Sequence, residues 1–218
     1  MKASEITQDS PINVMKKMHL ATLENDEKSY LECIYRDKKY DEIAKITVEY
    51  NYLNYKFSEK VKEKYGDEGL FRLQDMASGD KDMVIIRFQP RDTPWWNDME
   101  VEYSGNAAHY WDPWLMRQMD FIKIGDKWYG NMPKGMPEIY IEYNTVSAKQ
   151  MIHALKTCMP LIGKPGMDVD DLRRELGKYV DDIDTLAEKI EHVPGKKVFL
   201  RMTTEPMPYK REIPLDDK

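Results

Sequence analysis

Apolar residues recur at helical spacing over the first third of the chain. Ser10 and Pro11 open this pattern, and they are typical of a helix start because serine accepts free amide hydrogens and proline already has a helical φ angle. The spacing of the apolar positions then predicts helices over residues 11–24, 27–36 and 41–65, and Asp26 can cap the second of these helices.

The third of these helices is predicted from apolar residues that follow one another at steps of three and four. They are Ile43, Ile46, Tyr50, Leu53, Phe57, Val61 and Tyr65. The opposite side carries charges of both signs, which is typical of a solvated helix face. Gly66 supplies the left-handed residue that commonly ends a helix.

After about residue 80 the apolar period changes to that of strands. Residues 83–88 are apolar on both sides, as in an inner strand that is covered twice. Two hairpins follow, with turns at residues 105–106 and 125–126. We therefore expect a curved antiparallel sheet over about residues 81–133.

The first hairpin has a defined register if Ser104 and Ala107 close its turn. This register pairs His109 with Glu102, and it places His109 and Asp112 on opposite faces of the sheet. His109 and Asp112 are therefore not expected to act together as a dyad.

Residues 145–191 are predicted to form a helical hairpin. Asp168 and Asp171 have the spacing of a capping box at the start of its second helix. A narrow apolar stripe follows, formed by Val169, Leu172, Leu176, Tyr179, Ile183, Leu186 and Ile190. We expect this stripe to be buried within its own chain, because closing the short loop before it costs less entropy than recruiting a second chain.

The predicted fold class is α+β, with helices packed on a curved sheet and a helical extension behind it. Residues 1–9 are expected to be extended or disordered, and residues 10–135 to form the main domain. Residues 140–195 contain the helical hairpin, and residues 196–218 read as a short strand and an arm or disordered tail.

Composition narrows the classes of function. The 218 residues include 33 Lys and Arg against 39 Asp and Glu, so the net charge of -6 gives no general attraction to nucleic acid or to an anionic membrane. The mean hydropathy of -0.72 agrees with the lack of a membrane-spanning run. The amino terminus does not read as a secretory signal. We expect a cytoplasmic protein if Met1 is the native start, and a periplasmic or secreted one if a signal peptide was removed.

Three segments carry a resemblance to a known family. They are "SPINVMKKMHLATLENDEKSYLECIY", "MEVEYSGNAAHYW" and "DFIKIGDKWYGNM". In order and spacing they resemble the first two helices and the two late hairpins of the nuclear transport factor 2-like superfamily, over roughly residues 10–133. The appended helices are similar to those of uncharacterised bacterial members.

This resemblance implies a cone-shaped fold with a pocket at its open end. The superfamily includes isomerases, dehydratases, cyclases and plain binding domains, so the fold alone does not define a reaction. It also implies a homodimer formed through the outer face of the sheet. Neither a cofactor nor a metal is expected, because the sequence contains no phosphate-binding loop and no histidine pair spaced for zinc.

The best catalytic candidate is Asp112, an acid on an otherwise apolar strand face. Tyr110 and Tyr103 share that face and could donate hydrogen bonds to a substrate. The sequence also allows a purely structural role, since Asp112 precedes Pro113 and this pair often opens a turn.

Four tryptophans lie within twenty residues and form the candidate binding surface. These are Trp95, Trp96, Trp111 and Trp114, with Tyr103 near them and Arg91 and Arg117 flanking them. Indole rings can anchor a ligand or partner, the arginines could hold a carboxylate, and the same rings could simply fill the core.

The sequence thus favours non-catalytic binding of a small apolar or aromatic molecule, or of a protein partner. A cofactor-free lyase or isomerase with Asp112 as base is the first alternative, and an assembly domain is the second.

Overall fold

The computed structural model describes most of the 218 residues. The described part leaves out residues 36–37, 75–95, 97–98, 113–116, 132–137 and 180–218. The predicted inner strand at 83–88 and the predicted tail at 196–218 therefore lie outside it.

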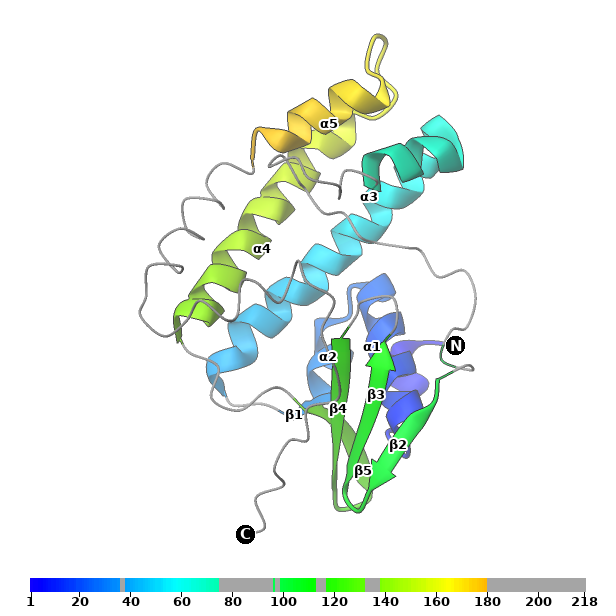
Figure 1. Ribbon diagram of the computed structural model, residues 1–218, viewed down its shortest axis with the longest axis vertical. Helices are drawn as coiled ribbons and strands as arrows, with labels where there is room; N and C mark the ends of the chain where they lie inside the picture. The colour runs from blue at the N-terminus through cyan, green and yellow to red at the C-terminus, as the bar shows by residue number, and fades with distance from the viewer. Residues whose placement is uncertain (36–37, 75–95, 97–98, 113–116, 132–137, 180–218) are drawn as a thin grey trace.

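The described residues have an α+β architecture, as predicted, which combines a five-stranded sheet with a set of helices (Figure 1). The helices are α1 (Pro11–Glu24), α2 (Glu27–Glu32), α3 (Asp41–Gln74), α4 (Glu138–Cys158) and α5 (Val169–Gly177), with short 3-10 turns η1 (Ala3–Glu5), η2 (Lys38–Tyr40) and η4 (Met159–Leu161). The strands are β1 (Ile34–Tyr35), β2 (Val101–Ser104), β3 (Ala107–Asp112), β4 (Arg117–Ile124) and β5 (Lys127–Asn131).

Three helix starts are set by the side chains that the sequence predicted. The Ser10 hydroxyl accepts a hydrogen bond from the Asn13 amide at 3.2 Å and caps α1. The Asp26 carboxylate caps α2, and Asp168 forms a capping box with Asp171 ahead of α5. Local capping chemistry therefore fixes these boundaries.

Helix α3 changes direction at Gly66, where the sequence predicted its end. Gly66 has a φ of 73°, and helical structure resumes after it and continues to Gln74. The glycine makes this break without strain because it has no Cβ.

The sheet has the strand order β1-β5-β4-β3-β2. Ser104 pairs with Ala107 and Glu102 with His109, which confirms the predicted register of the first hairpin. In the second hairpin Ile124 pairs with Lys127, so the turn lies at residues 125–126, as predicted.

The sheet is mixed, which corrects the expectation of a purely antiparallel sheet. Strand β1 runs parallel to β5, and its residues fall in a segment predicted to be helical, 27–36. Helix α2 ends before Cys33, whose carbonyl accepts a hydrogen bond from the Gly130 amide at 2.8 Å. This bond draws the chain out of the helix and onto the edge of the sheet.

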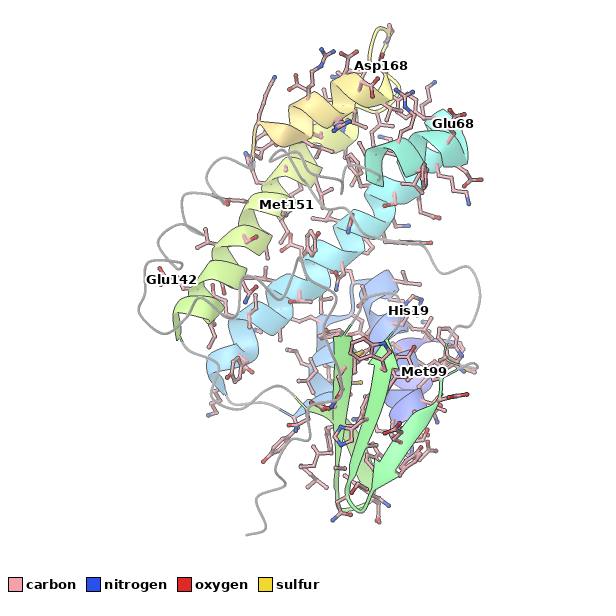
Figure 2. All side chains as sticks on the ribbon, viewed as in Figure 1. His19, Glu68, Met99, Glu142, Met151 and Asp168 are labelled. Atoms are coloured by element: carbon pink, nitrogen blue, oxygen red, sulfur yellow. The ribbon has the colours of Figure 1, made fainter. Side chains whose placement is uncertain are left out.

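The structure has two apolar clusters, one in the half that contains the sheet and one in the half made of helices. In the half that contains the sheet, α1 covers one face, with Val14, Tyr110, Phe121 and Trp128 among the buried residues. The other cluster lies between α3, α4 and α5. Figure 2 shows His19 and Met99 in the half that contains the sheet, and Met151 and Asp168 in the half made of helices.

Helices α3 and α4 are parallel neighbours. Lys149 pairs with Glu42 at 2.7 Å and Lys156 with Glu49 at 2.6 Å, both pairs at a separation of 107 residues. Because the residue numbers of the paired side chains rise together on both helices, α3 and α4 run in the same direction, as Figure 1 shows.

The apolar stripe of α5 is buried within the chain, as predicted for its first part. Val169, Leu172 and Leu176 are at most 5% exposed and pack with residues of α3 and α4. The later stripe residues, from Ile183 onward, lie outside the described part. None of the described helices is both long and apolar enough to cross a membrane.

Candidate functional site

The structure describes only some of the side chains that the sequence predicted as catalytic. Asp112 is the last residue of β3 and pairs in register with Arg117, but the side chains of both lie outside the described part. Tyr110 is 8% exposed and packs in the core against α1, whereas Tyr103 is 59% exposed and meets the Trp128 ring edge-on at 5.7 Å between centroids. Tyr110 is thus part of the apolar core, and Tyr103 packs on the Trp128 ring at the surface.

The predicted aromatic surface is divided between two faces. Trp96 packs on the core cluster and its ring lies 5.6 Å from that of His19. Trp111 is 44% exposed and alternates along β3 with the buried Tyr110, so it lies on the outer face of the sheet. Trp95, Trp114 and Arg91, the remaining predicted members, lie outside the described residues.

The outer face carries a polar cluster around His109. Its Nδ1 lies 2.7 Å from Asp120 Oδ1, and the Gln118 amide donates a hydrogen bond to the same oxygen at 2.7 Å. The predicted register with Glu102 is present, but Asp120 on the neighbouring strand is the ion-pair partner of His109. No group of three potential metal ligands occurs in the part of the chain that is described.

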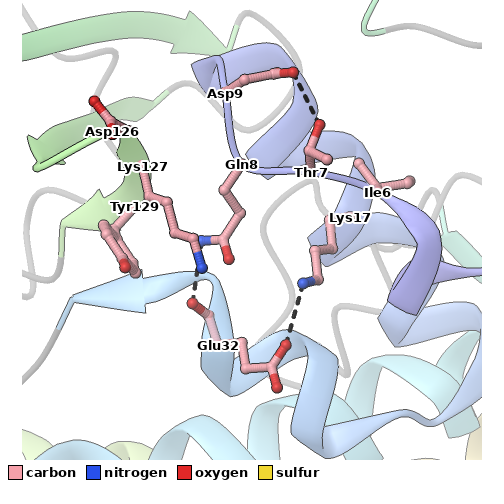
Figure 3. Close-up of a pocket in the computed structure, with 9 residues that line it drawn as sticks. All are labelled: Ile6, Thr7, Gln8, Asp9, Lys17, Glu32, Asp126, Lys127 and Tyr129. Carbon is pink, nitrogen blue, oxygen red and sulfur yellow. Dashed lines mark hydrogen bonds and ion pairs between the residues drawn. The ribbon is translucent and has the colours of Figure 1, made fainter.

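A cavity of about 600 Å³ lies at the edge of the sheet (Figure 3). Its walls come from the amino-terminal residues 6–9, from Lys17 on α1, from Glu32 at the end of α2, and from Asp126, Lys127 and Tyr129 around the start of β5. Residues from the first 32 positions and residues around the start of β5 therefore converge on one space.

Gln8 is the group that ties these walls together. It is 8% exposed, and its Nε2 donates hydrogen bonds to the backbone carbonyls of Glu32 at 3.1 Å and Trp128 at 3.0 Å. Its own backbone carbonyl accepts a hydrogen bond from the Trp128 amide at 2.7 Å. Since both hydrogens of the amide are engaged, Oε1 is left as the acceptor that faces the cavity.

Lys17 places a positive charge in the wall. It is 6% exposed, and its Nζ lies 3.2 Å from Glu32 Oε2, whose side chain is half exposed. Lys17 is buried because it occupies the same helical stripe as Val14 and Ala21. A buried ammonium needs such a partner to offset its lost hydration.

The charged side chains around the cavity do not all point into it. Figure 3 shows the side chains of Lys17, Lys127, Gln8 and Glu32 pointing toward one another, while those of Asp9 and Asp126 are turned away. Hydrogen bonds from Thr7 and Asn13 hold Asp9 in place and keep its pKa below its usual value. The centre of the cavity thus contains ammonium and carboxylate groups side by side.

The sequence did not reveal this cavity. Residues 1–9 were expected to be extended or disordered, and nothing in their pattern indicated that Ala3 is fully buried and that Ile6 and Gln8 are both 8% exposed. One signal was available: Lys17 falls at helical spacing between apolar residues, where a charge is unusual.

Comparisons with known proteins identify no relative. No protein-family model matches the chain, and searches among curated proteins and among solved structures give no significant match.

Proposed function

We propose that the protein is a non-catalytic binding domain that holds a small polar molecule in the cavity between residues 6–9, α1, α2 and β5. The observation that carries this proposal is the presence of two polar side chains, Gln8 and Lys17, that are more than nine-tenths buried and that line one space. Burying such groups is costly unless they have hydrogen-bonding partners, and the partners of Gln8 and Lys17 hold both side chains at the wall of the cavity.

The size and the rigidity of the cavity support a small-molecule ligand. A volume of about 600 Å³ falls within the usual range for ligand pockets. The hydrogen bonds of Gln8 join the amino-terminal segment to α2 and β5, so the walls are preorganised. Preorganised polar groups lower the entropy lost on binding.

The chemistry of the lining favours a polar ligand over the apolar or aromatic one that the sequence suggested. Three charged side chains, those of Lys17, Glu32 and Lys127, point into the cavity together with the amide of Gln8. An apolar molecule would strip water from these groups without replacing their hydrogen bonds.

The positions and partners of Lys17 and of the two candidate tyrosines favour binding without catalysis. Lys17 is engaged with Glu32, and a lysine held as an ammonium in an ion pair is not available as a base or nucleophile. Tyr110 and Tyr103, the donors that the lyase or isomerase alternative needs, lie in the core and on the surface and do not line this cavity.

An NMR titration of the whole chain tests the proposal. The amide spectrum is recorded with separate panels of amino acids, carboxylic acids, amines and sugars at millimolar concentration. We expect one panel to shift the amide signals of residues 6–9 and 126–129 while those of α4 and α5 stay in place. If no panel moves these signals, or if shifts spread over the whole surface, the proposal is wrong.

We also propose the relationship to the nuclear transport factor 2-like superfamily and the homodimer that it implies. The supports are the helix-helix start of the chain and its two late hairpins, together with an outer sheet face that carries the exposed Trp111. Light scattering on the purified protein gives the mass directly, and a monomer at high concentration would contradict the dimer.

A further inference from the structure

We propose that the molecule bound in this cavity is a zwitterion of the amino-acid class, with its ammonium on Glu32 and Gln8 and its carboxylate on Lys17 and Lys127. This inference rests on the proposed function, because it names the ligand of that site. Two donors, Lys17 and Lys127, and two acceptors, Gln8 and Glu32, point toward one space, with the Glu32 carboxylate paired to Lys17 (Figure 3).

The acceptors are an anionic oxygen and a neutral oxygen. Glu32 uses Oε2 for Lys17, so its Oε1 is left for a donor from the ligand, and its side chain is 48% exposed. Gln8 offers Oε1, because Nε2 is spent on the carbonyls of Glu32 and Trp128. A primary ammonium has three hydrogens and can donate to both oxygens.

The donors are two ammonium groups that point at the same space. Lys17 Nζ gives one hydrogen to Glu32 and has two more, and Lys127 extends its Nζ toward the centre from the start of β5. A carboxylate between these groups would form charge-assisted hydrogen bonds, which are about twice as strong as neutral ones.

The charge balance favours a ligand that carries both signs. The convergent groups Lys17, Lys127 and Glu32 sum to one positive charge, whereas the full lining, which includes Asp9 and Asp126, sums to one negative charge. A simple anion would leave Glu32 facing like charge, and a simple cation would face two lysines. A zwitterion meets an opposite charge at each end.

The rest of the lining has room for a side chain. Ile6 and Tyr129 add an aliphatic and an aromatic wall to a cavity of about 600 Å³, which exceeds the needs of the charged ends alone. Amino acids with an aliphatic or aromatic side chain are therefore expected to bind more tightly than glycine.

Calorimetric titration of the full-length protein tests this with matched probes. After all common amino acids have been screened, leucine is compared with isocaproate, which lacks the amino group, and with isopentylamine, which lacks the carboxylate. We expect leucine to bind at least about tenfold more tightly than either truncated probe, a difference of about 1.4 kcal/mol or more. If another amino acid binds best, its own deaminated and decarboxylated forms replace these probes.

Two substitutions assign the ends of the ligand. Glu32→Gln is expected to weaken leucine binding by about tenfold or more and to leave isocaproate binding unchanged or stronger. Lys127→Met should weaken leucine and isocaproate alike. Lys149→Met, which removes a surface lysine paired with Glu42 on α3, is the matched control and should change neither affinity.

Each outcome decides the inference. If a carboxylic acid, an amine or a sugar binds as well as its amino-acid counterpart at residues 6–9 and 126–129, the zwitterion is wrong and the binding function stands. If no amino acid binds at millimolar concentration, the inference is overturned. If no probe of any class binds there, the proposed function fails with it.

Discussion

Lys17 and Glu32 form an ion pair in which only one partner is exposed to solvent. The Lys17 side chain is 7% exposed and that of Glu32 48%, with Nζ and Oε2 3.2 Å apart. The energetic consequences of removing the two groups are therefore unequal, because water can replace a partner for Glu32 far more easily than for Lys17.

Removing Glu32 should destabilise the protein more than removing Lys17. We expect Glu32→Ala to lower the free energy of unfolding by about 1–2 kcal/mol, a figure reduced for the exposure of the pair, since it leaves a buried ammonium without its partner. Lys17→Met should cost less, and the double variant should recover part of the loss of Glu32→Ala. Urea denaturation measures all three, and equal losses in both single variants would contradict this asymmetry.

The Tyr65 hydroxyl joins α3 to the loop before α5. It donates a hydrogen bond to the Met167 carbonyl at 2.8 Å and accepts one from the Gly163 amide at 2.9 Å. Tyr65→Phe removes both bonds and keeps the ring, so we expect a loss of about 1–2 kcal/mol in the free energy of unfolding. Tyr103→Phe, on an exposed ring, is the matched control and should change stability by less than about 0.5 kcal/mol. Comparable losses in the two variants would argue against the bridge.

The two thiols should be unreactive in the folded protein. Burial raises the pKa of Cys33 to about 12 and that of Cys158 to about 11, from an ordinary value of 9.0. At about pH 8 both thiols stay protonated in the folded state, so a disulfide reagent should react slowly with native protein and rapidly in concentrated urea. Rapid modification of either cysteine without denaturant would show that its burial is wrong.

The same thiols give stability a dependence on alkaline pH. The folded state favours the neutral form, so this contribution is complete below the unfolded pKa of 9.0 and is lost as the pH rises from there toward the folded values. Cys33→Ala and Cys158→Ala should each flatten the alkaline decline in urea midpoint. An unchanged slope in both variants would contradict this assignment.

The outer face of the sheet can be tested as the dimer surface. Trp111 is 44% exposed there, so Trp111→Ser should leave the folded chain stable to within about 0.5 kcal/mol. If this face forms the proposed homodimer, the variant should be a folded monomer by light scattering and circular dichroism. Phe71→Ser on α3, which removes another exposed ring, should stay dimeric. A dimer that persists in Trp111→Ser would place the interface elsewhere.

Features that depend on neighbouring residues could be predicted from the sequence. The caps at Ser10 and Asp26 and the register of Ser104 with Ala107 depend on contacts a few residues away, and each is present in the structure. Side-chain chemistry at such short separations leaves few alternative conformations.

Features that depend on distant residues could not be predicted. Gln8 contacts Trp128 across 120 residues, and β1 becomes a strand only because β5 lies beside it. The two residues of β1 have no periodic pattern of their own, and the polar segment before α1 resembles a disordered terminus. The candidate site is built from these long-range contacts, which is why the sequence directed attention to Asp112 and the tryptophans.

The parallel packing of α3 on α4 has a consequence for synthesis on the ribosome. Helix α3 is complete once Gln74 has been added, but α4, which covers its apolar face, ends at Cys158. At ordinary rates of translation the chain waits on the order of 10 s between these points. During that interval Phe57 and Val61, fully buried in the finished protein, have no α4 to cover them. The nascent chain is therefore expected to be a client of chaperones that bind exposed apolar helices, and a stalled or truncated product should aggregate.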